Sequence, residues 1–244
     1  MIPTIAPLRP SAWQAIVDFD GTISRQDTTD AILTRFADPH WHAIEEEWLA
    51  GRIGSRDCMR RQIELLRVSP QALDAFIDTI EIDGGFSSFV HLCARHDIPV
   101  TVVSDGLDRT IHAVLTRAGL GHLQVVANHL SHGGGERWSL SSPHAAMSGA
   151  CTSGTCKCAV ADSLQRPLTL LVGDGRSDHC VAGEADLVFA KKGLIAHCRE
   201  QSFPHRPFTD FSEATRLLED LLRTEAESQA RELTRDFTKD LING

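Results

Sequence analysis

Short apolar runs alternate along the chain with stretches in which apolar residues recur every three or four positions. The short runs are typical of strands buried on both faces of a parallel sheet, and the longer stretches are typical of amphipathic helices. The predicted strands are AIV (15–17), IPVTVV (98–103), LQVVA (123–127), LTLLV (168–172) and DLVFA (186–190). Their alternation with helical patterns predicts an α/β fold, with a parallel sheet covered by helices.

Between the first two predicted strands the apolar pattern is helical throughout. Glycine and proline residues divide it into four predicted helices, TTDAILTRFA (28–37), HAIEEEWLA (42–50), SRDCMRRQIELLRV (55–68) and PQALDAFIDTI (70–80). We therefore expect a helical insertion after the first strand of the sheet. Further along, the polar stretch SHGGGERWSL (131–140) is typical of a hairpin tip. The expected organisation is a core of residues 12–24 and 84–225, a helical cap of residues 25–83 and a C-terminal helical tail of residues 226–244.

Composition and charge narrow the classes of partner. The chain has 244 residues, of which 42% are hydrophobic and 23% charged, and its net charge is −9. Nucleic-acid-binding proteins need a basic face, so no nucleic-acid partner is expected, although a bound cation could still recruit a small anionic substrate. No apolar run approaches the roughly 20 residues of a membrane span, and the start of the chain lacks a signal-peptide pattern. We expect a cytoplasmic protein with no membrane partner. The sequence leaves its oligomeric state open.

Seven cysteines are present, and three of them are crowded into the stretch CTSGTCKC. An odd number of cysteines without an export signal favours reduced thiols over a disulfide framework. Cys151, Cys156 and Cys158, with His144 nearby, could bind zinc, but their C-x4-C-x-C spacing is not a standard ligand pattern. A loop of reduced thiols beside Lys157 is the favoured interpretation.

Polar residues cluster where predicted strands end, which is the edge at which α/β sheets bind their ligands. They are Asp18 and Asp20 after the first strand, Ser104, Asp105 and Gly106 after the second, Lys157 before the fourth, and Asp174 and Asp178 after it. Singly, each has an ordinary alternative: the Asp-Gly pairs could be turns, Ser104 a helix cap, and Lys157 a solvated lysine. Together they converge on one edge. Three carboxylates meeting there would repel one another unless a divalent cation lay among them, and oxygen ligands without histidine suggest magnesium.

The ordered set of DFDGT, a serine after the second strand, a lysine and GDGxxD resembles the motifs of the haloacid dehalogenase superfamily of phosphohydrolases, subfamily IB. The resemblance covers nearly the whole chain. It implies a Rossmann-like core, a parallel sheet flanked by helices, and a small helical cap of the C1 type inserted after strand 1. Within the superfamily the chain is similar to the branch that holds phosphoserine phosphatase and the methionine-salvage phosphatase acting on 2-hydroxy-3-keto-5-methylthiopentenyl-1-phosphate. The stretches EWLAGRIGSRDCM, VVSDGLD and HCREQSFPHRPFTDF, and the cysteine before Lys157, are most similar to the methionine-salvage sequences.

The resemblance implies a role for each residue of the set. Asp18 is the nucleophile that forms an aspartyl-phosphate, and Asp20 is the general acid and base. Magnesium is held by Asp18, the Asp20 carbonyl and Asp174, while Asp178 orients Lys157 or the metal's water ligands. Phosphate is bound by Ser104 and by the backbone N–H groups of Asp105 and Gly106, Lys157 supplies a fixed positive charge, and Asp27 contacts the organic part of the substrate.

Two departures from the pattern of this branch bear on the substrate. The branch commonly has Ser-Gly-Gly where this chain has Ser104-Asp105-Gly106, so the Asp105 carboxylate must point away from the phosphate. Gln62 falls where phosphoserine phosphatases carry an arginine that grips the substrate carboxylate, although Arg60 and Arg61 lie close by in sequence. The expected function is magnesium-dependent hydrolysis of small phosphorylated metabolites, with a substrate of the methionine-salvage type. The alternatives are a phosphoserine phosphatase or another small-metabolite phosphatase, a phosphoryl-transferring mutase and, from another class, a non-catalytic metal- or metabolite-binding module.

Overall fold

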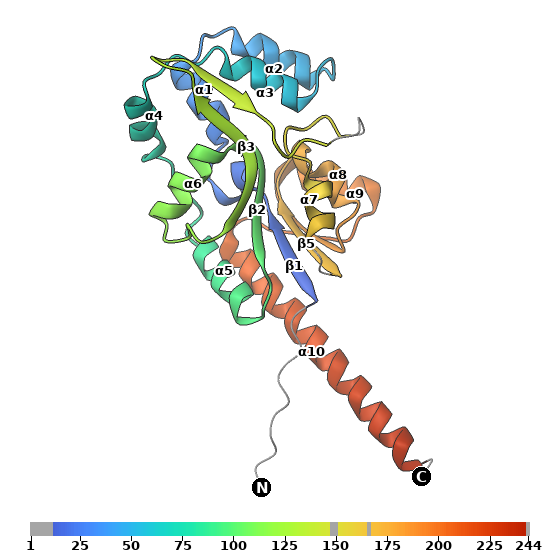
Figure 1. Ribbon diagram of the computed structural model, residues 1–244. Helices are drawn as coiled ribbons and strands as arrows, with labels where there is room; N and C mark the ends of the chain where they lie inside the picture. The colour runs from blue at the N-terminus through green and yellow to red at the C-terminus, as the bar shows by residue number, and fades with distance from the viewer. Residues whose placement is uncertain (1–11, 147–150, 165–166, 243–244) are drawn as a thin grey trace.

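A seven-stranded sheet runs through the centre of the protein, in a computed structural model that describes residues 12–146, 151–164 and 167–242 (Figure 1). The start of the chain and the last two residues of the predicted tail lie outside these ranges. The strand order is β4-β3-β2-β1-β5-β6-β7, and every neighbouring pair is parallel except β3 and β4. The strands are β1 (Trp13–Val17), β2 (Val100–Leu107), β3 (Gln124–His132), β4 (Trp138–Ser141), β5 (Leu168–Gly173), β6 (Leu187–Ala190) and β7 (His205–Pro207).

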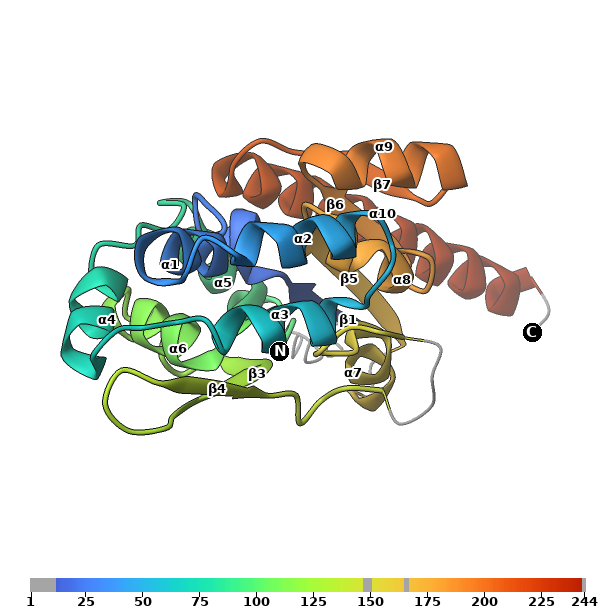
Figure 2. The ribbon, with the colours of Figure 1, turned by 90° about the horizontal axis from the view of Figure 1, so that it is seen from above.

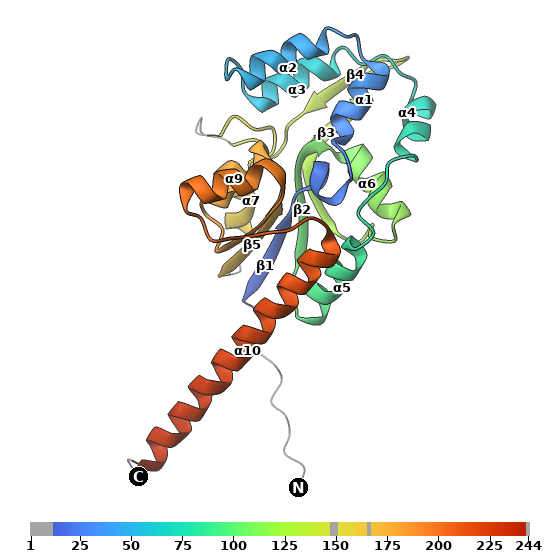
Figure 3. The same ribbon diagram turned by 180° about the vertical axis from the view of Figure 1, so that it is seen from behind.

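Helices cover both faces of the sheet. One face carries α5 (Phe86–Arg95), α6 (Asp108–Arg117) and α10 (Phe211–Ile242), and α5 and α10 lie side by side (Figures 1 and 3). The other face carries α7 (Lys157–Ser163), α8 (His179–Ala182) and α9 (Lys192–Gln201). A mainly parallel sheet with helices on both faces is the α/β architecture that the sequence predicted, and this prediction is confirmed.

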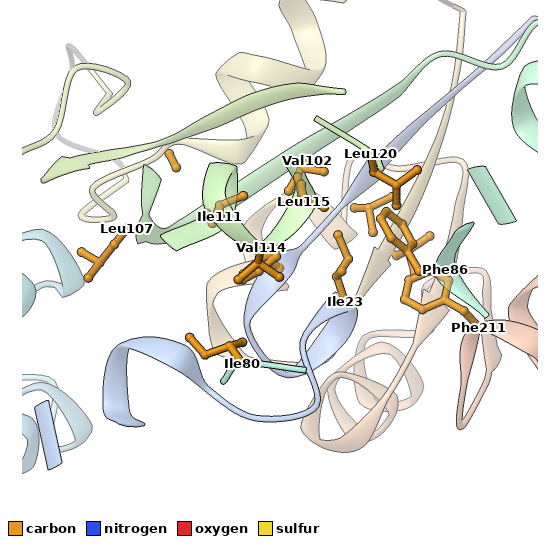
Figure 4. Packing of buried hydrophobic residues seen from close by; sticks show 14 of the residues in the cluster. Ile23, Ile80, Phe86, Val102, Leu107, Ile111, Val114, Leu115, Leu120 and Phe211 are labelled. Atoms are coloured by element: carbon orange, nitrogen blue, oxygen red, sulfur yellow. The ribbon is translucent and has the colours of Figure 1, made fainter. Parts of the chain in front are cut away.

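The two helical layers explain why the central strands are apolar on both sides. Along β1, Ala15 and Val17 belong to the larger hydrophobic cluster, whereas Ile16 belongs to the cluster on the opposite face, and all three are fully buried. In the larger cluster the rings of Phe86 and Phe211 meet with centroids 4.8 Å apart, which joins α5 to the start of α10 (Figure 4). Each large side chain buried in this way contributes about 1.5–3 kcal/mol of hydrophobic stabilisation.

The region between β1 and β2 forms the four predicted helices, here called the inserted helices. They are α1 (Thr28–Phe36), α2 (Trp41–Leu49), α3 (Ser55–Ile63) and α4 (Pro70–Ile77). Two of their starts are capped by side chains, since Asp27 accepts a hydrogen bond from the Asp30 N–H and Ser69 caps the helix that begins at Pro70. Seen from above, α2 and α3 lie side by side (Figure 2).

Several predicted boundaries were wrong. The second strand was expected to end at residue 103, but β2 continues to Leu107 through a shift in its register with β3, so Ser104, Asp105 and Gly106 lie within the strand. The third inserted helix ends at Ile63 rather than at residue 68, because Leu66 pairs with Ala37 in an isolated bridge. The hairpin prediction is confirmed by the antiparallel pair β3 and β4. Across the described residues, no helix has both the length and the apolar character that a membrane crossing requires.

Candidate active site

Asp18, Lys157 and Asp178 form a buried ion network at the carboxyl ends of β1 and β5. The Lys157 ammonium donates hydrogen bonds to Asp18 Oδ1 at 2.6 Å and to Asp178 Oδ1 at 2.5 Å. None of the three residues is more than 3% exposed. Burial raises the pKa of Asp18 well above its ordinary range, and the Lys157 charge opposes that rise. Burial alone would lower the pKa of Lys157, but the two carboxylates outweigh it and raise this pKa, so the ammonium stays charged.

Asp20 stands two residues beyond Asp18, in the turn η1 (Phe19–Ile23), with its carboxylate held apart from this network. Its Oδ1 accepts hydrogen bonds from the Thr28 N–H at 2.8 Å and the Thr28 hydroxyl at 2.6 Å, and its Oδ2 lies 3.5 Å from the Ser104 hydroxyl. Burial, with added repulsion from Asp27, raises the pKa of Asp20 to about 7, although the Thr28 hydrogen bonds oppose the rise. A carboxyl group with a pKa near neutrality can both donate and accept a proton at working pH.

Asp174 completes a group of acids suited to a cation. Asp18, Asp174 and Asp178 each offer a carboxylate oxygen, and these oxygens all lie within 4.8 Å of one another. An oxygen-only donor set of this kind fits a hard divalent cation. Of the four aspartates predicted to hold the metal or to orient its water ligands, Asp20 is the one whose carboxylate is outside the group. Hydrogen bonds from Thr28 hold the Asp20 side chain away from the other three acids. The resemblance assigned the backbone carbonyl of Asp20 to the metal, and that assignment stays a prediction.

Backbone turns bring the acids to this short separation. Gly21 has a φ of +73°, and a Cβ there would lie 2.3 Å from Asp174 Oδ2. Gly106 likewise leaves room for Asp20, because a Cβ at that position would lie 2.2 Å from Asp20 Oδ2. A side chain at either glycine would displace a carboxylate of the site.

The Ser104-Asp105-Gly106 segment lies near the carboxyl end of β2. The Ser104 hydroxyl accepts a hydrogen bond from the Gly106 N–H at 2.9 Å. The helix-cap alternative for Ser104 is wrong, because α6 begins at Asp108 and no side chain caps it.

The Asp105 carboxylate is held by hydrogen bonds from three separate parts of the chain. Its Oδ1 accepts hydrogen bonds from the Thr155 N–H at 2.9 Å and the Asn128 amide at 3.1 Å, and its Oδ2 accepts one from the Ser55 hydroxyl. Ser55 is the first residue of α3, so this side chain ties an inserted helix to the sheet. The carboxylate therefore serves as a structural link, and the backbone of the segment is left to meet an anion.

A cavity of about 290 Å³ lies over these groups. Its lining joins strand ends of the sheet to α1, α2 and α3, and it includes the predicted residues Asp18, Asp20, Asp27, Ser104, Asp105, Gly106 and Asp174. Lys157 and Asp178 are not part of this lining, but Lys157 bonds to Asp18 and Asp178 bonds to Lys157. The structure therefore brings all nine predicted site residues to one place.

The described residues of the cysteine-rich loop form no second group of close metal-ligand atoms. Within the ranges that the structure describes, the three aspartates are the one group of at least three acidic, cysteine or histidine ligands with oxygen, nitrogen or sulfur atoms that close together. Cys156 precedes Lys157 as the N-cap residue of α7, and all seven cysteines are free. The interpretation as reduced thiols is favoured over zinc.

Sequence reasoning missed several residues of the pocket. The structure adds Thr28, which bonds Asp20, and Lys192, which pairs with Asp174 at 2.8 Å. It also adds Glu45 and Arg176 to the cavity lining, and it places Gln62, which the sequence had singled out, in the same lining. Thr28 is the first residue of a predicted helix and follows directly on Asp27, so it could have been suspected, whereas Glu45 had no signal beyond its place in an amphipathic helix.

Fold and site together define an α/β protein with an aspartate-lined pocket at the carboxyl edge of its sheet. The model of the haloacid dehalogenase-like hydrolases matches residues 15–183, and the chain belongs to that family. The family membership that the motifs predicted is confirmed.

Curated relatives carry a more specific name. Two proteins named 2-hydroxy-3-keto-5-methylthiopentenyl-1-phosphate phosphatase are similar over 200 residues, one from Geobacillus kaustophilus at 34% identity and one from Geobacillus thermodenitrificans at 32%. Each match covers 80% of this chain and 90% of the relative.

Solved structures show the same fold at lower identity. A substrate-bound phosphoserine phosphatase complex aligns with a TM-score of 0.63 at 20% identity, covering 84% of this chain and 97% of its own. A hydrolase of the same family from Salmonella enterica aligns with a TM-score of 0.65 at 19% identity, covering 84% of this chain and 70% of its own.

Proposed function

We propose that this chain is a magnesium-dependent phosphatase of small phosphorylated metabolites that works through an aspartyl-phosphate on Asp18. The observation that carries the proposal is the position of Asp18 in the cavity lining, with Lys157 bonded to its carboxylate at 2.6 Å and Asp20 nearby in the same lining. The family and the curated relatives support phosphatase chemistry. A non-catalytic binding module would have no need of both aspartates.

The chemistry follows from the two environments. A carboxylate oxygen of Asp18 attacks phosphorus in line, the bond from phosphorus to the leaving oxygen breaks, and protonated Asp20 donates its proton to that oxygen. Asp20 then accepts a proton from the water that attacks the aspartyl-phosphate, which releases phosphate and restores Asp18. The pKa of about 7 suits Asp20 to both steps. Magnesium held by Asp18, Asp174 and the Asp20 carbonyl, with Asp178 adjacent, would supply charge that offsets repulsion between carboxylates and phosphate.

The remaining residues hold the substrate. We assign the phosphate oxygens to the Ser104 hydroxyl, to the backbone N–H groups of its strand segment and to the charge of Lys157. Asp27 lines the same cavity and meets the organic part. The proposed organisation keeps the expected boundaries, with residues 12–24 and 84–225 as the core, 25–83 as the cap and 226–244 as the tail. The cavity lies between residues of the proposed core and cap, which supports this division.

Removing the metal should silence the enzyme. Chelation of magnesium should lower the rate of phosphate release from a generic aryl phosphate by at least about 10²-fold, since metal charge stabilisation contributes several kcal/mol. Added magnesium should restore the rate and raise the melting temperature, because a ligand that binds the native state stabilises it. Restoration by zinc alone would contradict the oxygen-ligand assignment and direct attention to Cys151–Cys158.

We propose a substrate of the methionine-salvage type in preference to phosphoserine. Such a substrate is a phosphomonoester whose organic part bears an enol or keto group and no charge. The names of the curated relatives support it. The structure adds that Arg60 and Arg61 are engaged elsewhere, Arg60 with Asp57 and Glu64, and Arg61 with Glu47. Neither arginine lines the cavity, whereas Gln62 does. A substrate carboxylate would therefore lack a bidentate partner at this position.

The test compares kcat/KM for 2-hydroxy-3-keto-5-methylthiopentenyl-1-phosphate and phosphoserine. The wild-type protein should favour the enol-phosphate by about 10²-fold or more, as expected when a buried carboxylate is left without a partner. Gln62→Arg should narrow that gap by improving phosphoserine. A wild-type preference for phosphoserine would make that compound the substrate and overturn the methionine-salvage assignment.

A further inference from the structure

Three acids form part of the lining of the catalytic cavity. Asp27, Asp30 and Glu45 all contribute to its wall, from the start of α1 and from α2. In the described part of the chain, none of these three carboxylates forms an ion pair with a lysine or arginine. This part of the lining, here called the acidic wall, therefore carries negative charge that no lysine or arginine of the described residues pairs with, and it includes Asp27, which we have proposed to meet the organic part of the substrate.

The cations that share the cavity lining have other contacts. Lys192 pairs with Asp174 at 2.8 Å, and Asp174 is one of the three acids proposed to hold the metal. Arg176 lies over the ring of Trp48 with its guanidinium carbon 5.1 Å from the centroid, and donates toward the Leu49 carbonyl at 3.4 Å. Their charges are committed to a carboxylate and to an aromatic face.

Glu45 is fixed in place from the neighbouring helix. The Gln62 side-chain amide donates a hydrogen bond to Glu45 Oε2 at 2.8 Å, and the Cys58 thiol lies 3.7 Å from the same oxygen. Gln62 and Cys58 are both 2% exposed, which makes them a rigid support on α3. The polar side chain at position 62 thus holds a carboxylate of the protein.

The acids of this wall already disfavour added negative charge. Reduced hydration, followed by repulsion from Glu45, raises the pKa of Asp30 to about 6, and reduced hydration with repulsion from Asp30 raises the pKa of Asp27 to about 6. A carboxylate on a bound substrate would add a further like charge, whereas a hydroxyl group could donate a hydrogen bond to the wall and an ammonium group would neutralise it.

We propose that Glu45, held by Gln62, is a specificity-determining residue that makes the cavity reject phosphomonoesters with a carboxylate in their organic part and accept neutral or ammonium-bearing ones. This inference rests on the proposed function and assigns its substrate class: non-acidic phosphomonoesters of small alcohols and enols. Selection then comes from a repulsive element built into the pocket, in addition to the missing arginine.

Three phosphomonoesters of similar size separate the effect of the substrate's charge from that of its shape. They are phosphoethanolamine, 2-hydroxyethyl phosphate and phosphoglycolate. For the wild-type protein with magnesium, kcat/KM should fall in that order, with about 10²-fold between the first and the last. Glu45→Gln keeps the size of the side chain and should reduce this ratio at least about 10-fold, mainly through KM. Glu46→Gln is the matched control, because Glu46 is exposed on the same helix and outside the cavity lining, so the ratio should not change.

Binding measurements separate this inference from the proposed reaction. Calorimetric Kd values for 2-aminoethylphosphonate and phosphonoacetate report the same charge preference without turnover. The ratio of the two Kd values therefore tests the role of Glu45 even if the protein hydrolyses none of the three esters. Asp30→Asn, as a second variant, should shift the Kd ratio in the same direction as Glu45→Gln. Tighter binding of phosphonoacetate by the wild-type protein, or a ratio changed no more by Glu45→Gln than by Glu46→Gln, would overturn the assignment.

Discussion

Asp18→Asn should abolish turnover, with kcat lowered by on the order of 10⁴-fold or more, as loss of a covalent nucleophile does in other enzymes. The amide has nearly the shape of the carboxylate, and its oxygen can still accept the hydrogen bond from Lys157, which is 2.6 Å long in the native protein. It is, however, too weak a nucleophile to attack phosphorus. The measurement is steady-state phosphate release, with the melting temperature and calorimetric magnesium binding recorded for the same preparation.

The fold and metal binding should survive that substitution, which distinguishes a chemical from a structural role. Asp162→Asn is a suitable control, because Asp162 is an exposed carboxylate on α7, outside the cavity lining, and should leave both rate and stability unchanged. Appreciable multiple-turnover activity in Asp18→Asn would remove Asp18 from the nucleophile role.

The chemistry at the sheet edge could be predicted because parallel strands place their carboxyl ends together. Asp18 and Asp174 are far apart in sequence, yet β1 and β5 are adjacent parallel strands, so both residues follow the same edge. Residues that follow predicted strands were therefore placed correctly without tertiary information.

Side-chain environments could not be predicted in the same way. Lys157 had an ordinary alternative as a solvated lysine, but it is 1% exposed between two carboxylates. Nothing local shows this, because its partners come from β1 and from the turn after β5. The contacts of the Asp105 carboxylate could not be predicted for the same reason, since Ser55 and Asn128 reach it from separate elements.

Some helices and strands were not predicted from the sequence, and the reason differs from one to the next. The edge strand β7 (His205–Pro207) has three residues and no apolar alternation. In contrast, α5 has the signal of buried residues at helical spacing, Phe86, Phe89, Val90 and Cys93, and a closer pattern count would have found it. The start of α10 at Phe211 depends on packing against α5, which sequence periodicity does not show.

Lys157→Met should destabilise the protein by about 3–5 kcal/mol, because it leaves two buried carboxylates without their cation. Lys157 is the partner of both Asp18 and Asp178, and Asp178 is fully buried. The same substitution should lower turnover by on the order of 10²–10³-fold, since a fixed positive charge is lost from the proposed site of phosphoryl transfer. Urea unfolding in the absence of metal measures the stability, and phosphate release with saturating magnesium measures the rate.

The buried location decides the size of this effect, and Lys192 provides the comparison. Its side chain is 59% exposed while it pairs with Asp174 at 2.8 Å, so Lys192→Met should cost no more than about 1 kcal/mol. Adding Asp178→Asn to Lys157→Met removes one of the unpaired carboxylates and should recover part of the lost stability. Magnesium should recover more, since the cation would lie among Asp18, Asp174 and Asp178. If Lys157→Met and Lys192→Met had equal costs, the buried network would not be the electrostatic centre of the site.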